Sequence, residues 1–300
     1  MAAAPIRYYH RARAREETEE IFGERWLRFA YEHPVGRLAV WLLARRALFS
    51  RWYGHRMNRP ASARLILPFI ARYNLDVDEF ATSPFKFEHF NAFFSPPPRP
   101  AGRPGPPGDD VAVLPADGRH LVFPDVAAAD GFYVKGARFT LAELLDDADL
   151  AVRFAGGTMV ISRLCPVDYH RFHFPVAGVP GEARRVQGWL YSVSPIALRR
   201  RIRYLVENKR EITLVESPAF GPVAVLEVGA TNVGSIVQSF VPGRPAAKGE
   251  EKGLFAFGGS CVITLFARGR IRCDADLVAQ SARHVETYAR MGERLGVAAG

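Results

Sequence analysis

Hydrophobic and polar positions follow two different periods in the two parts of the chain. Between residues 15 and 80 the apolar positions recur every three to four residues, which is the spacing of amphipathic helices. The stretch REETEEIFGERWLRFAYEH, residues 15–33, carries acids in its first turns and arginines later, in agreement with the helix dipole, and Pro34 follows it. We therefore predict helices over this region, the first of them beginning near residue 15.

The next segment, VGRLAVWLLARRALFSRWYGHRM, residues 35–57, has an aromatic and aliphatic face. That face holds Leu38, Trp41, Leu42, Leu48, Phe49 and Trp52. Tryptophans mixed with arginines and without acids suit a helix that lies in a membrane interface. A helix buried in a protein core would show a similar face, and the pattern leaves both interpretations open. A third segment, residues 62–75, predicts a short helix kinked at Pro68.

The pattern changes after the Pro/Gly-rich stretch SPPPRPAGRPGPPGDD, residues 95–110, which can form neither a helix nor a central strand. From residue 111 onward, short runs rich in Val, Ile, Phe and Tyr are separated by Gly, Pro and Asp, and this spacing predicts antiparallel strands. FTLAELLDD, residues 139–147, predicts one short helix. The expected fold is α+β: a helical region over residues 1–94, a loop over 95–110, and a sandwich-like or barrel-like β domain over 111–300.

Composition and charge narrow the classes of function. The chain of 300 residues is 48% hydrophobic and 24% charged, which is typical of a globular protein, and its net charge is +9. Residues 33–64 contain seven arginines and no Asp or Glu, which favours an anionic partner such as nucleic acid or a phospholipid surface, although a solvated basic face has the same appearance. We find no nucleic-acid recognition motif and expect no nucleic-acid partner.

Cysteine usage and the N-terminus exclude further classes. Three cysteines without a CxxC pair argue against a disulfide framework and a cysteine-based zinc site. The first 20 residues are too polar for a signal peptide, and the longest early apolar run, residues 38–44, is far shorter than the about 20 residues that span a bilayer. A soluble or peripheral protein is expected.

Four stretches carry candidate chemistry. Asp117 lies in LPADGRH, where Asp-Gly is also an ordinary turn signal. His170 and His173 lie in RLCPVDYHRFHFPVAG; their spacing could serve a metal, but flanking prolines argue against a helix and no third ligand is evident, so acid–base use is the better interpretation. The small-residue run EVGATNVGSI allows close backbone approach. Finally, Gly258-Gly259-Ser260 joins two apolar runs, as a hairpin turn would.

Together these stretches resemble the phosphatidylserine decarboxylase family. The resemblance rests on an ordered set over residues 85–296: FNAFF, LPADG, VKG with FTLAELL, CPVDYHRFHFPVAG, GWLYSVSP, NKRE, VGATNVGSI, the GGS turn and ETYARMGERLG. No single element carries the assignment; the order of the set does.

The resemblance gives the turn a chemical meaning. Family members make a pyruvoyl group from their own chain, so Ser260 is expected to attack the Gly259 carbonyl and cleave the chain between residues 259 and 260. His173 matches the family's base, and Asp117 matches the carboxylate that orients it. The resemblance thus implies a catalytic triad of Ser260, His173 and Asp117, which come from distant segments of the chain. His170 matches the residue proposed to protonate the decarboxylated substrate.

The function implied by the resemblance is decarboxylation of phosphatidylserine to phosphatidylethanolamine and CO2 through an imine between substrate and pyruvoyl group. The pyruvoyl group would be the cofactor, with no metal; the large and small chains would stay associated, and assembly into a homo-oligomer is left open. The basic helices imply an anionic membrane surface as partner and a peripheral location on the cytoplasmic side of the cell membrane. Two alternatives remain: a pyruvoyl-dependent decarboxylase of another serine-headed lipid or a free amino acid, and a non-catalytic membrane-binding homologue.

The sequence departs from the family pattern in two places. Cys261 stands where the family commonly has Thr, which removes a hydroxyl next to the cleavage site. The arginine that usually follows FNAFF is replaced by the proline-rich stretch, where Arg99 or Arg103 could substitute. Arg171 and residues 209–210 are further candidates for anion contacts.

Overall fold

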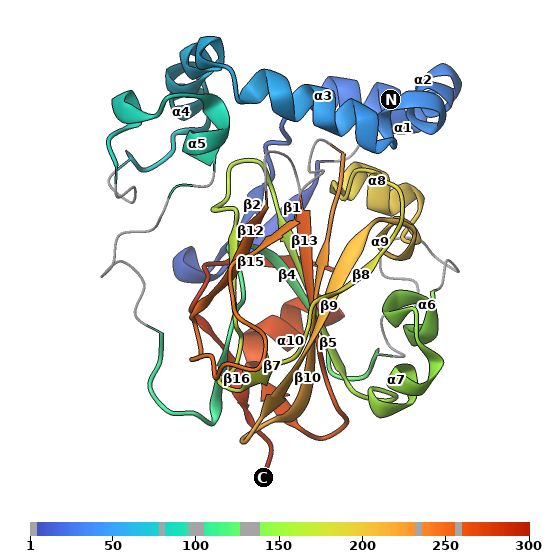
Figure 1. The fold of residues 1–300 in the computed structure, drawn as a ribbon, viewed down its shortest axis with the longest axis vertical. Coiled ribbons are helices and arrows are strands. Elements are labelled where there is room, and N and C mark those ends of the chain that lie inside the picture. The colour runs from blue at the N-terminus through green and yellow to red at the C-terminus, as the bar shows by residue number, and fades with distance from the viewer. Residues whose placement is uncertain are drawn as a thin grey trace.

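A computed structural model describes residues 5–77, 82–94, 96, 105–126, 139–231, 236–255 and 260–300. The Gly258-Gly259 turn and the motif at residues 134–136 lie outside the described residues, as do Arg99, Arg103 and part of the small-residue run. The chain folds around one large sheet, with a layer of helices across one end of it (Figure 1).

The large sheet has ten strands within the described residues. Their order is β2-β1-β15-β4-β5-β13-β10-β9-β7, and β8 also pairs with β9. Neighbouring strands are antiparallel except β1 and β15, which are parallel. The strands are β1 (Arg7–His10), β2 (Arg15–Thr18), β4 (Gly118–Phe123), β5 (Thr158–Leu164), β7 (Val179–Pro180), β8 (Arg184–Val186), β9 (Arg210–Ser217), β10 (Gly221–Val228), β13 (Ser260–Phe266) and β15 (Glu286–Ala289).

Two smaller sheets accompany the large one. The first has the order β11-β12-β6 and the second β14-β16-β3. Their strands are β3 (Val111–Val113), β6 (Arg171–His173), β11 (Ile236–Gln238), β12 (Glu251–Phe255), β14 (Ile271–Cys273) and β16 (Arg294–Ala298). β6 and β12 position the candidate chemistry, because β6 ends at His173 and β12 ends just before the Gly-Gly turn.

The helices form two groups (Figure 1). The layer at the top of Figure 1 consists of α1 (Glu24–Glu32), α2 (Pro34–Ala39), α3 (Ala47–Met57), α4 (Ile66–Tyr73) and α5 (Phe90–Phe94). The others lie beside the sheet: α6 (Leu141–Leu145), α7 (Ala148–Arg153), α8 (Pro195–Arg200), α9 (Tyr204–Glu207) and α10 (Ala275–Ala282). None of the described helices is long and apolar enough to cross a lipid bilayer.

Alternation along the central strands explains why the sheet is buried on both faces. In β10, Val223 and Val225 pack into one core with residues of β6 and β12, whereas Ala224 and Leu226 pack into a second core with residues of α6 to α9. Successive side chains of a strand point to opposite faces, so near-continuous apolar runs result when both faces are covered. By the same alternation, Ser260 lies on the face of β13 that carries Val262 and Phe266, which belong to the first core.

The predicted α+β class is confirmed, as is the short helix α6, which begins with a capping box between Thr140 and Glu143. The helix predicted from residue 15 is wrong at its start. Residues 15–18 form β2, which pairs with β1 in the main sheet, and Gly23, at φ 66°, precedes α1. A charged strand at the edge of a sheet looks like a helix start in sequence because both are rich in acids.

The helical layer also differs in detail from the prediction. Residues 35–57 form no single helix: α2 continues into a π-helical turn over Val40–Ala44, and α3 begins after Arg46. Pro68 does not kink α4, because the helix begins at Ile66 and its first-turn amides need no partner within the helix. Leu38, Trp41, Leu42, Leu48 and Trp52 are exposed and Phe49 is half-buried, so the buried-helix interpretation of this face fails within this chain.

Candidate active site

Ser260 is the first residue of β13, in the middle of the large sheet. It pairs with Leu164 of β5 and is fully buried. In the described part of the chain its Oγ has no hydrogen-bond partner. A buried hydroxyl without a partner costs about 1–3 kcal/mol. Thr264, on the same face of β13, is in the same state among the described residues, so it is the place of Ser260 at the start of the strand that distinguishes it.

Phe255 and Ser260, the described residues on either side of residues 256–259, both contact the stretch from Leu164 to His170. The amide of Phe255, the last residue of β12, donates to the carbonyl of His170 at 2.9 Å. Ser260 on the other side of the turn pairs with Leu164. The stretch from Leu164 to His170 therefore contacts the described residues on both sides of residues 256–259.

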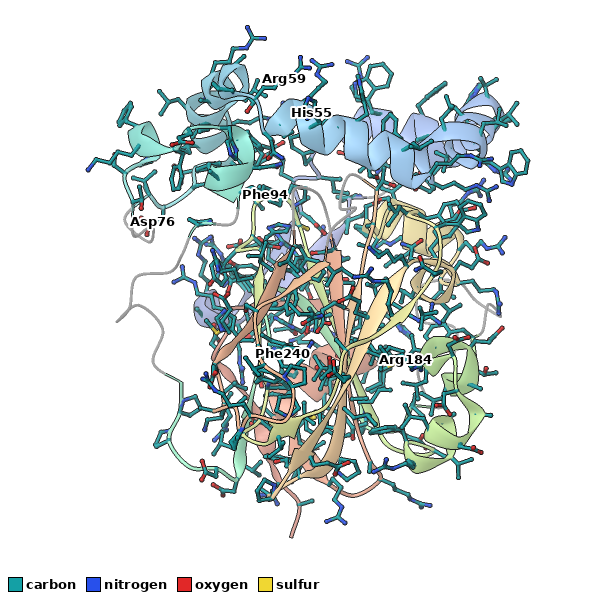
Figure 2. The ribbon with its side chains drawn as sticks, in the orientation of Figure 1. His55, Arg59, Asp76, Phe94, Arg184 and Phe240 are labelled. Atoms are coloured by element: carbon teal, nitrogen blue, oxygen red, sulfur yellow. The ribbon has the colours of Figure 1, made fainter. Side chains whose placement is uncertain are left out.

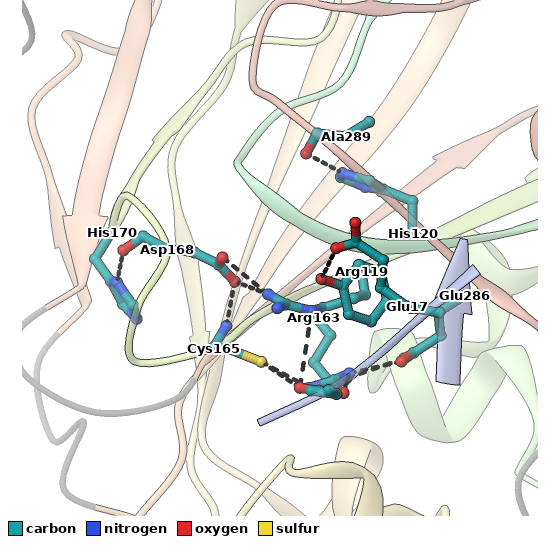
Figure 3. Close-up of polar contacts among 11 residues, drawn as sticks. Glu17, Arg119, His120, Arg163, Cys165, Asp168, His170, Glu286 and Ala289 are labelled. Atoms are coloured by element: carbon teal, nitrogen blue, oxygen red, sulfur yellow. Dashed lines mark hydrogen bonds and ion pairs between the residues drawn. The ribbon is translucent and has the colours of Figure 1, made fainter. Parts of the chain in front are cut away.

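His170 is fully buried and its ring is fixed (Figure 3). Its Nδ1 lies 2.6 Å from the main-chain carbonyl oxygen of Asp168. A carbonyl can only accept, so Nδ1 carries the hydrogen and Nε2 is the nitrogen that can take up a proton. The ring centroid is 4.0 Å from that of Phe94, the last residue of α5, which encloses the histidine from the side of the helical layer.

His173 is also held through Nδ1. This nitrogen lies 3.0 Å from the carbonyl oxygen of Gly249, so it is the donor, and Nε2 lies 3.3 Å from the hydroxyl of Tyr169, which donates to it. The rings of Tyr169 and His173 are stacked, with their centroids 5.8 Å apart. Sequence reasoning did not assign Tyr169 a role, although it lies within the same motif as both histidines.

Asp117 lies in the turn before β4 and is buried, and its Oδ1 accepts from the amide of Met291 at 2.8 Å. The amide of His173 donates to the carbonyl of Pro115 at 2.8 Å, which brings β6 against this turn. β5 lies between β4 and β13, so Asp117 and Ser260 are at the same end of strands separated by one strand. The structure thus brings the segments of all four predicted residues to one end of the sheet.

A buried charge cluster that sequence reasoning missed supports this end of the sheet (Figure 3). It joins Arg119 and Arg163 to Glu19, Asp168 and Glu286. Arg163 contacts both glutamates in bidentate fashion, at 2.8 and 3.0 Å to Glu19 and at 2.6 and 2.9 Å to Glu286. No motif signals these contacts, because the partners lie 144 and 123 residues apart in the chain.

Electrostatics in the cluster keep the ion pairs charged. Burial on its own raises the pKa of Glu19, but the charges of Arg163 and Arg119 outweigh it and lower this pKa to about 2. Burial opposes the charge of each arginine, yet the neighbouring acidic groups raise the pKa of both above the ordinary value. Burial raises the pKa of the Cys165 thiol, which donates to Glu19 at 2.7 Å. This thiol is therefore a neutral hydrogen-bond donor.

A second buried ion pair faces the same side of the sheet as Ser260. Lys252 of β12 and Glu227 of β10 are both fully buried, with Nζ and Oε1 2.9 Å apart, and Gln238 bonds to both. Glu227 pairs across from Val262, which shares its face with Ser260 two residues earlier. Burial lowers the pKa of Lys252 and raises that of Glu227.

Of the two departures from the family pattern, the structure describes the one at Cys261. The side chain of Cys261 packs in the core on the opposite face of β13 from Ser260, and burial raises its pKa to about 12. The thiol is therefore directed away from the hydroxyl. Arg99 and Arg103, the candidate replacements for the arginine after Phe94, are outside the described residues.

The arginines named as candidate anion contacts have different partners in the structure. Arg171 donates to Glu251 at 2.8 Å and to the carbonyl of Pro96 at 3.2 Å. The guanidinium of Arg210 is buried and donates to four main-chain carbonyls, of Glu143, Leu144, Val206 and Asn208, so it has a structural task and is wrong as an anion contact. Within the described ranges, no group of three or more His, Cys, Asp or Glu side chains is arranged to hold a metal ion.

Comparison with known proteins agrees with this arrangement. The family model for phosphatidylserine decarboxylase matches residues 90–297. The chain is 44% identical over 296 residues to the phosphatidylserine decarboxylase proenzyme of Chlamydia trachomatis serovar L2, covering 99% of this chain and 98% of that protein. Proteins of the same name from Desulfitobacterium hafniense and Fusobacterium nucleatum are 39% and 38% identical, over 97% of this chain and 98% and 97% of theirs. The chain therefore belongs to the phosphatidylserine decarboxylase family.

Proposed function

We propose that this protein is a self-cleaving, pyruvoyl-dependent decarboxylase that converts phosphatidylserine to phosphatidylethanolamine and CO2. The observation that carries the proposal is Ser260: its hydroxyl is buried and, among the described residues, unbonded, at the start of β13, and Phe255 on the other side of the Gly258-Gly259 pair bonds to His170. The relatives' description as proenzymes supports a maturation step.

Maturation would use residues of the chain alone. His173 takes the proton of the Ser260 hydroxyl at Nε2, after the Tyr169 hydroxyl leaves this nitrogen, while the Gly249 carbonyl holds Nδ1. The carboxylate of Asp117 favours the charged imidazole that forms. Oγ then bonds to the Gly259 carbonyl carbon and the peptide C–N bond breaks, which leaves an ester. Elimination of the ester breaks the Cβ–O bond, so Gly259 becomes a C-terminal carboxylate, and hydrolysis of the resulting dehydroalanine releases ammonia and leaves a pyruvoyl group at position 260.

The fold explains why the two chains would stay together. β13, which begins at the cleavage site, lies between β5 and β10 in the centre of the large sheet. Its backbone hydrogen bonds to both neighbours remain after a cut before Ser260. β14, β15 and β16 hold the rest of the small chain in place.

In decarboxylation, the chemistry that a pyruvoyl group supplies is an electron sink for the pair of electrons left when CO2 departs. His170 then supplies the proton that replaces CO2 on the substrate. Its Nδ1 is committed to the Asp168 carbonyl, so a protonated ring delivers from Nε2 to the carbon that has lost CO2. Phe94 against the ring restricts water on that side.

The membrane location is part of the proposal. Leu43 and Leu48 are 63% and 73% exposed, and Trp26 is 78% exposed, all in the helical layer. Arg37, Arg46, Arg56, Arg59 and Arg64 are exposed around them, whereas Arg45 is buried, bonded to Tyr191 and stacked on Trp189, so it does not face a lipid. An apolar and basic surface that has no acid between residues 33 and 64 fits an anionic bilayer, here the cytoplasmic face of the cell membrane.

The helical layer also contacts the site. Phe94 touches His170, and Val167 packs against a cluster of Met57, Ile66, Phe69, Phe90, Phe93 and Phe94. A substrate held in a bilayer at this layer would thus have its headgroup close to the histidine segment, which favours a lipid over a free amino acid.

The test measures CO2 release from carboxyl-labelled phosphatidylserine in anionic vesicles by the wild type and by Ser260→Ala. We expect release by the wild type only. Release from free serine or from another serine-headed lipid instead of phosphatidylserine would replace the substrate assignment. No release from any of the three would leave the non-catalytic, membrane-binding alternative.

A further inference from the structure

The buried charge cluster includes a chain of contacts that ends on the ring of His170 (Figure 3). We propose that Arg119 is a positioning residue for His170: by holding the Asp168 side chain, it fixes the carbonyl that selects the ring's tautomer. The kinetic part of this inference rests on the proposed decarboxylase function, whereas the tautomer itself does not.

The first contact in this chain is between Arg119 and the Asp168 carboxylate. Nη1 of Arg119 lies 2.8 Å from Oδ1 and 2.6 Å from Oδ2. Both side chains are buried, with 7% and 3% of their surface exposed. Charge-assisted hydrogen bonds in a dry environment are strong and leave little freedom to the groups that they join.

The second contact is a pair of hydrogen bonds between Cys165 and Asp168, at the two ends of one turn. The amide of Cys165 donates to Oδ2 of Asp168 at 2.6 Å, and the amide of Asp168 donates to the carbonyl of Cys165 at 2.9 Å. Asp168 is therefore held to Cys165 by both its carboxylate and its main-chain amide. As a result, its carbonyl oxygen points at Nδ1 of His170, 2.6 Å away.

Arg119 is itself placed rigidly. It lies in β4 directly opposite Arg163 of β5, and its guanidinium carbon is 5.0 and 5.1 Å from the ring centroids of Tyr8 and Tyr288. Glu19 lies 3.7 Å from its Nε and offsets the proximity of the two arginines. The residue thus connects β1, β15 and the segment just after β2 to the histidine segment.

The consequence for catalysis is a choice between two nitrogens. A histidine that transfers a proton needs the reactive nitrogen aimed at the substrate and the other one occupied. Without Arg119, the Asp168 carboxylate would be buried with one partner fewer, and the turn would change to expose or re-pair it. The carbonyl would then no longer hold Nδ1, and the ring could take either tautomer.

The kinetic test compares Arg119→Gln, Arg119→Lys and the control Arg210→Gln on the processed fraction of the full chain. Arg210 is also a buried arginine, and its hydrogen bonds within the described residues go to main-chain carbonyls around α6 and α9. With phosphatidylserine vesicles we expect Arg119→Gln to lower kcat by about 10- to 100-fold with KM within about twofold. Arg119→Lys should recover part of the loss, and Arg210→Gln should leave kcat within about twofold.

The second measurement reads the tautomer directly, from the two ring ¹⁵N shifts of His170 in ¹⁵N-histidine-labelled protein, assigned with His170→Gln. We expect Nδ1–H in the wild type and in Arg210→Gln, and a mixture in Arg119→Gln. Where Arg119→Gln does not fold, Asp168→Asn replaces it with the same expectation. An Nε2–H tautomer in the wild type, or an unchanged tautomer and kcat in the variants, would overturn the inference.

The two failures are distinguishable. A wild type that neither cleaves itself nor releases CO2 refutes the proposed function and leaves the tautomer measurement to decide this inference. A wild type that is active, beside a processed Arg119→Gln with unchanged kcat, refutes the positioning role alone.

Discussion

His170 and His173 are three residues apart and have the same tautomer, yet their surroundings differ. The ring of His170 lies close to Phe94 and is bonded through Nδ1 to the Asp168 carbonyl, whereas Nε2 of His173 accepts from the Tyr169 hydroxyl. His173 belongs to β6, beside the turn of Asp117, whereas the main chain of His170 bonds to the end of β12. The proposed division, with His173 in maturation and His170 in turnover, rests on the resemblance to the family.

Substitution of each histidine should separate the two steps. We expect His173→Gln to remain a single uncut chain, because no base takes the proton of Ser260. His170→Gln should be cut but should lose about 100-fold or more in kcat, since general acid–base groups contribute that much. Gel analysis of processing beside CO2 release from phosphatidylserine vesicles checks both. Cleavage of His173→Gln at the wild-type rate would refute the assignment of roles.

At this scale the sequence indicated the candidate reacting residues but not the residues that hold them in place. Asp117, His170, His173 and Ser260 follow from ordered motifs, and motifs are local. Arg119 lies two residues after Asp117, yet nothing in LPADGRH shows that it meets Asp168, 49 residues later. Long-range ion pairs depend on strand register, which single-sequence patterns do not specify.

Among the elements, the hairpin of β1 and β2 has a role that helix patterning concealed. β1 runs parallel to β15, so residues near the two ends of the chain pair, for example Tyr8 with Glu286. The hairpin leads to Glu19, which lies between Arg163, Arg119 and Cys165. The segment expected to begin the first helix thus completes the charge cluster beside the candidate site.

Glu19→Gln should destabilise the fold and alter its response to acid. Removing one partner of a buried ion pair costs on the order of 3–5 kcal/mol. The pKa of Glu19 is lowered to about 2 from its ordinary 4.5, so its contribution is complete above pH 4.5 and is lost as pH falls toward 2. Urea unfolding at several pH values should show a gap between wild type and variant that narrows across this range.

The neighbouring Glu20→Gln is a matched control, because Glu20 is 62% exposed and lies 3.7 Å from an exposed Arg72. It should change the free energy of unfolding by less than about 1 kcal/mol. A gap for Glu19→Gln that stays constant from about pH 6 to about pH 2.5 would contradict the buried-ion-pair account.

The whole molecule places an apolar, basic layer of helices at the end of the sheet where the candidate site lies (Figure 2). His55 and Arg59 lie on the outer side of that layer and Phe94 on its inner side, towards the sheet. Composition and patterning predicted the chemistry of this layer. They could not predict that Arg45 turns inward to Tyr191 and Trp189, since Tyr191 lies 146 residues away in the chain.

The double variant Leu43→Ser/Leu48→Ser should weaken binding to anionic vesicles by roughly tenfold or more, because each leucine would bury an apolar side chain in the interface. Sedimentation with vesicles measures this, and added salt should weaken wild-type binding as well. Val152→Ser is the control: Val152 is 76% exposed but lies on α7, away from the layer. Equal binding by wild type and double variant would rule out this docking face.

The central claim is that the chain cuts itself at Ser260, and the intact mass of purified wild type beside Ser260→Ala tests it most directly. The account predicts two masses for the wild type, one of them the fragment from position 260 to Gly300 with a pyruvoyl group at its start, and a single full-length mass for the variant. One uncut chain in both samples, even after incubation with anionic vesicles, would contradict it and would make the Gly-Gly-Ser stretch a turn without chemistry.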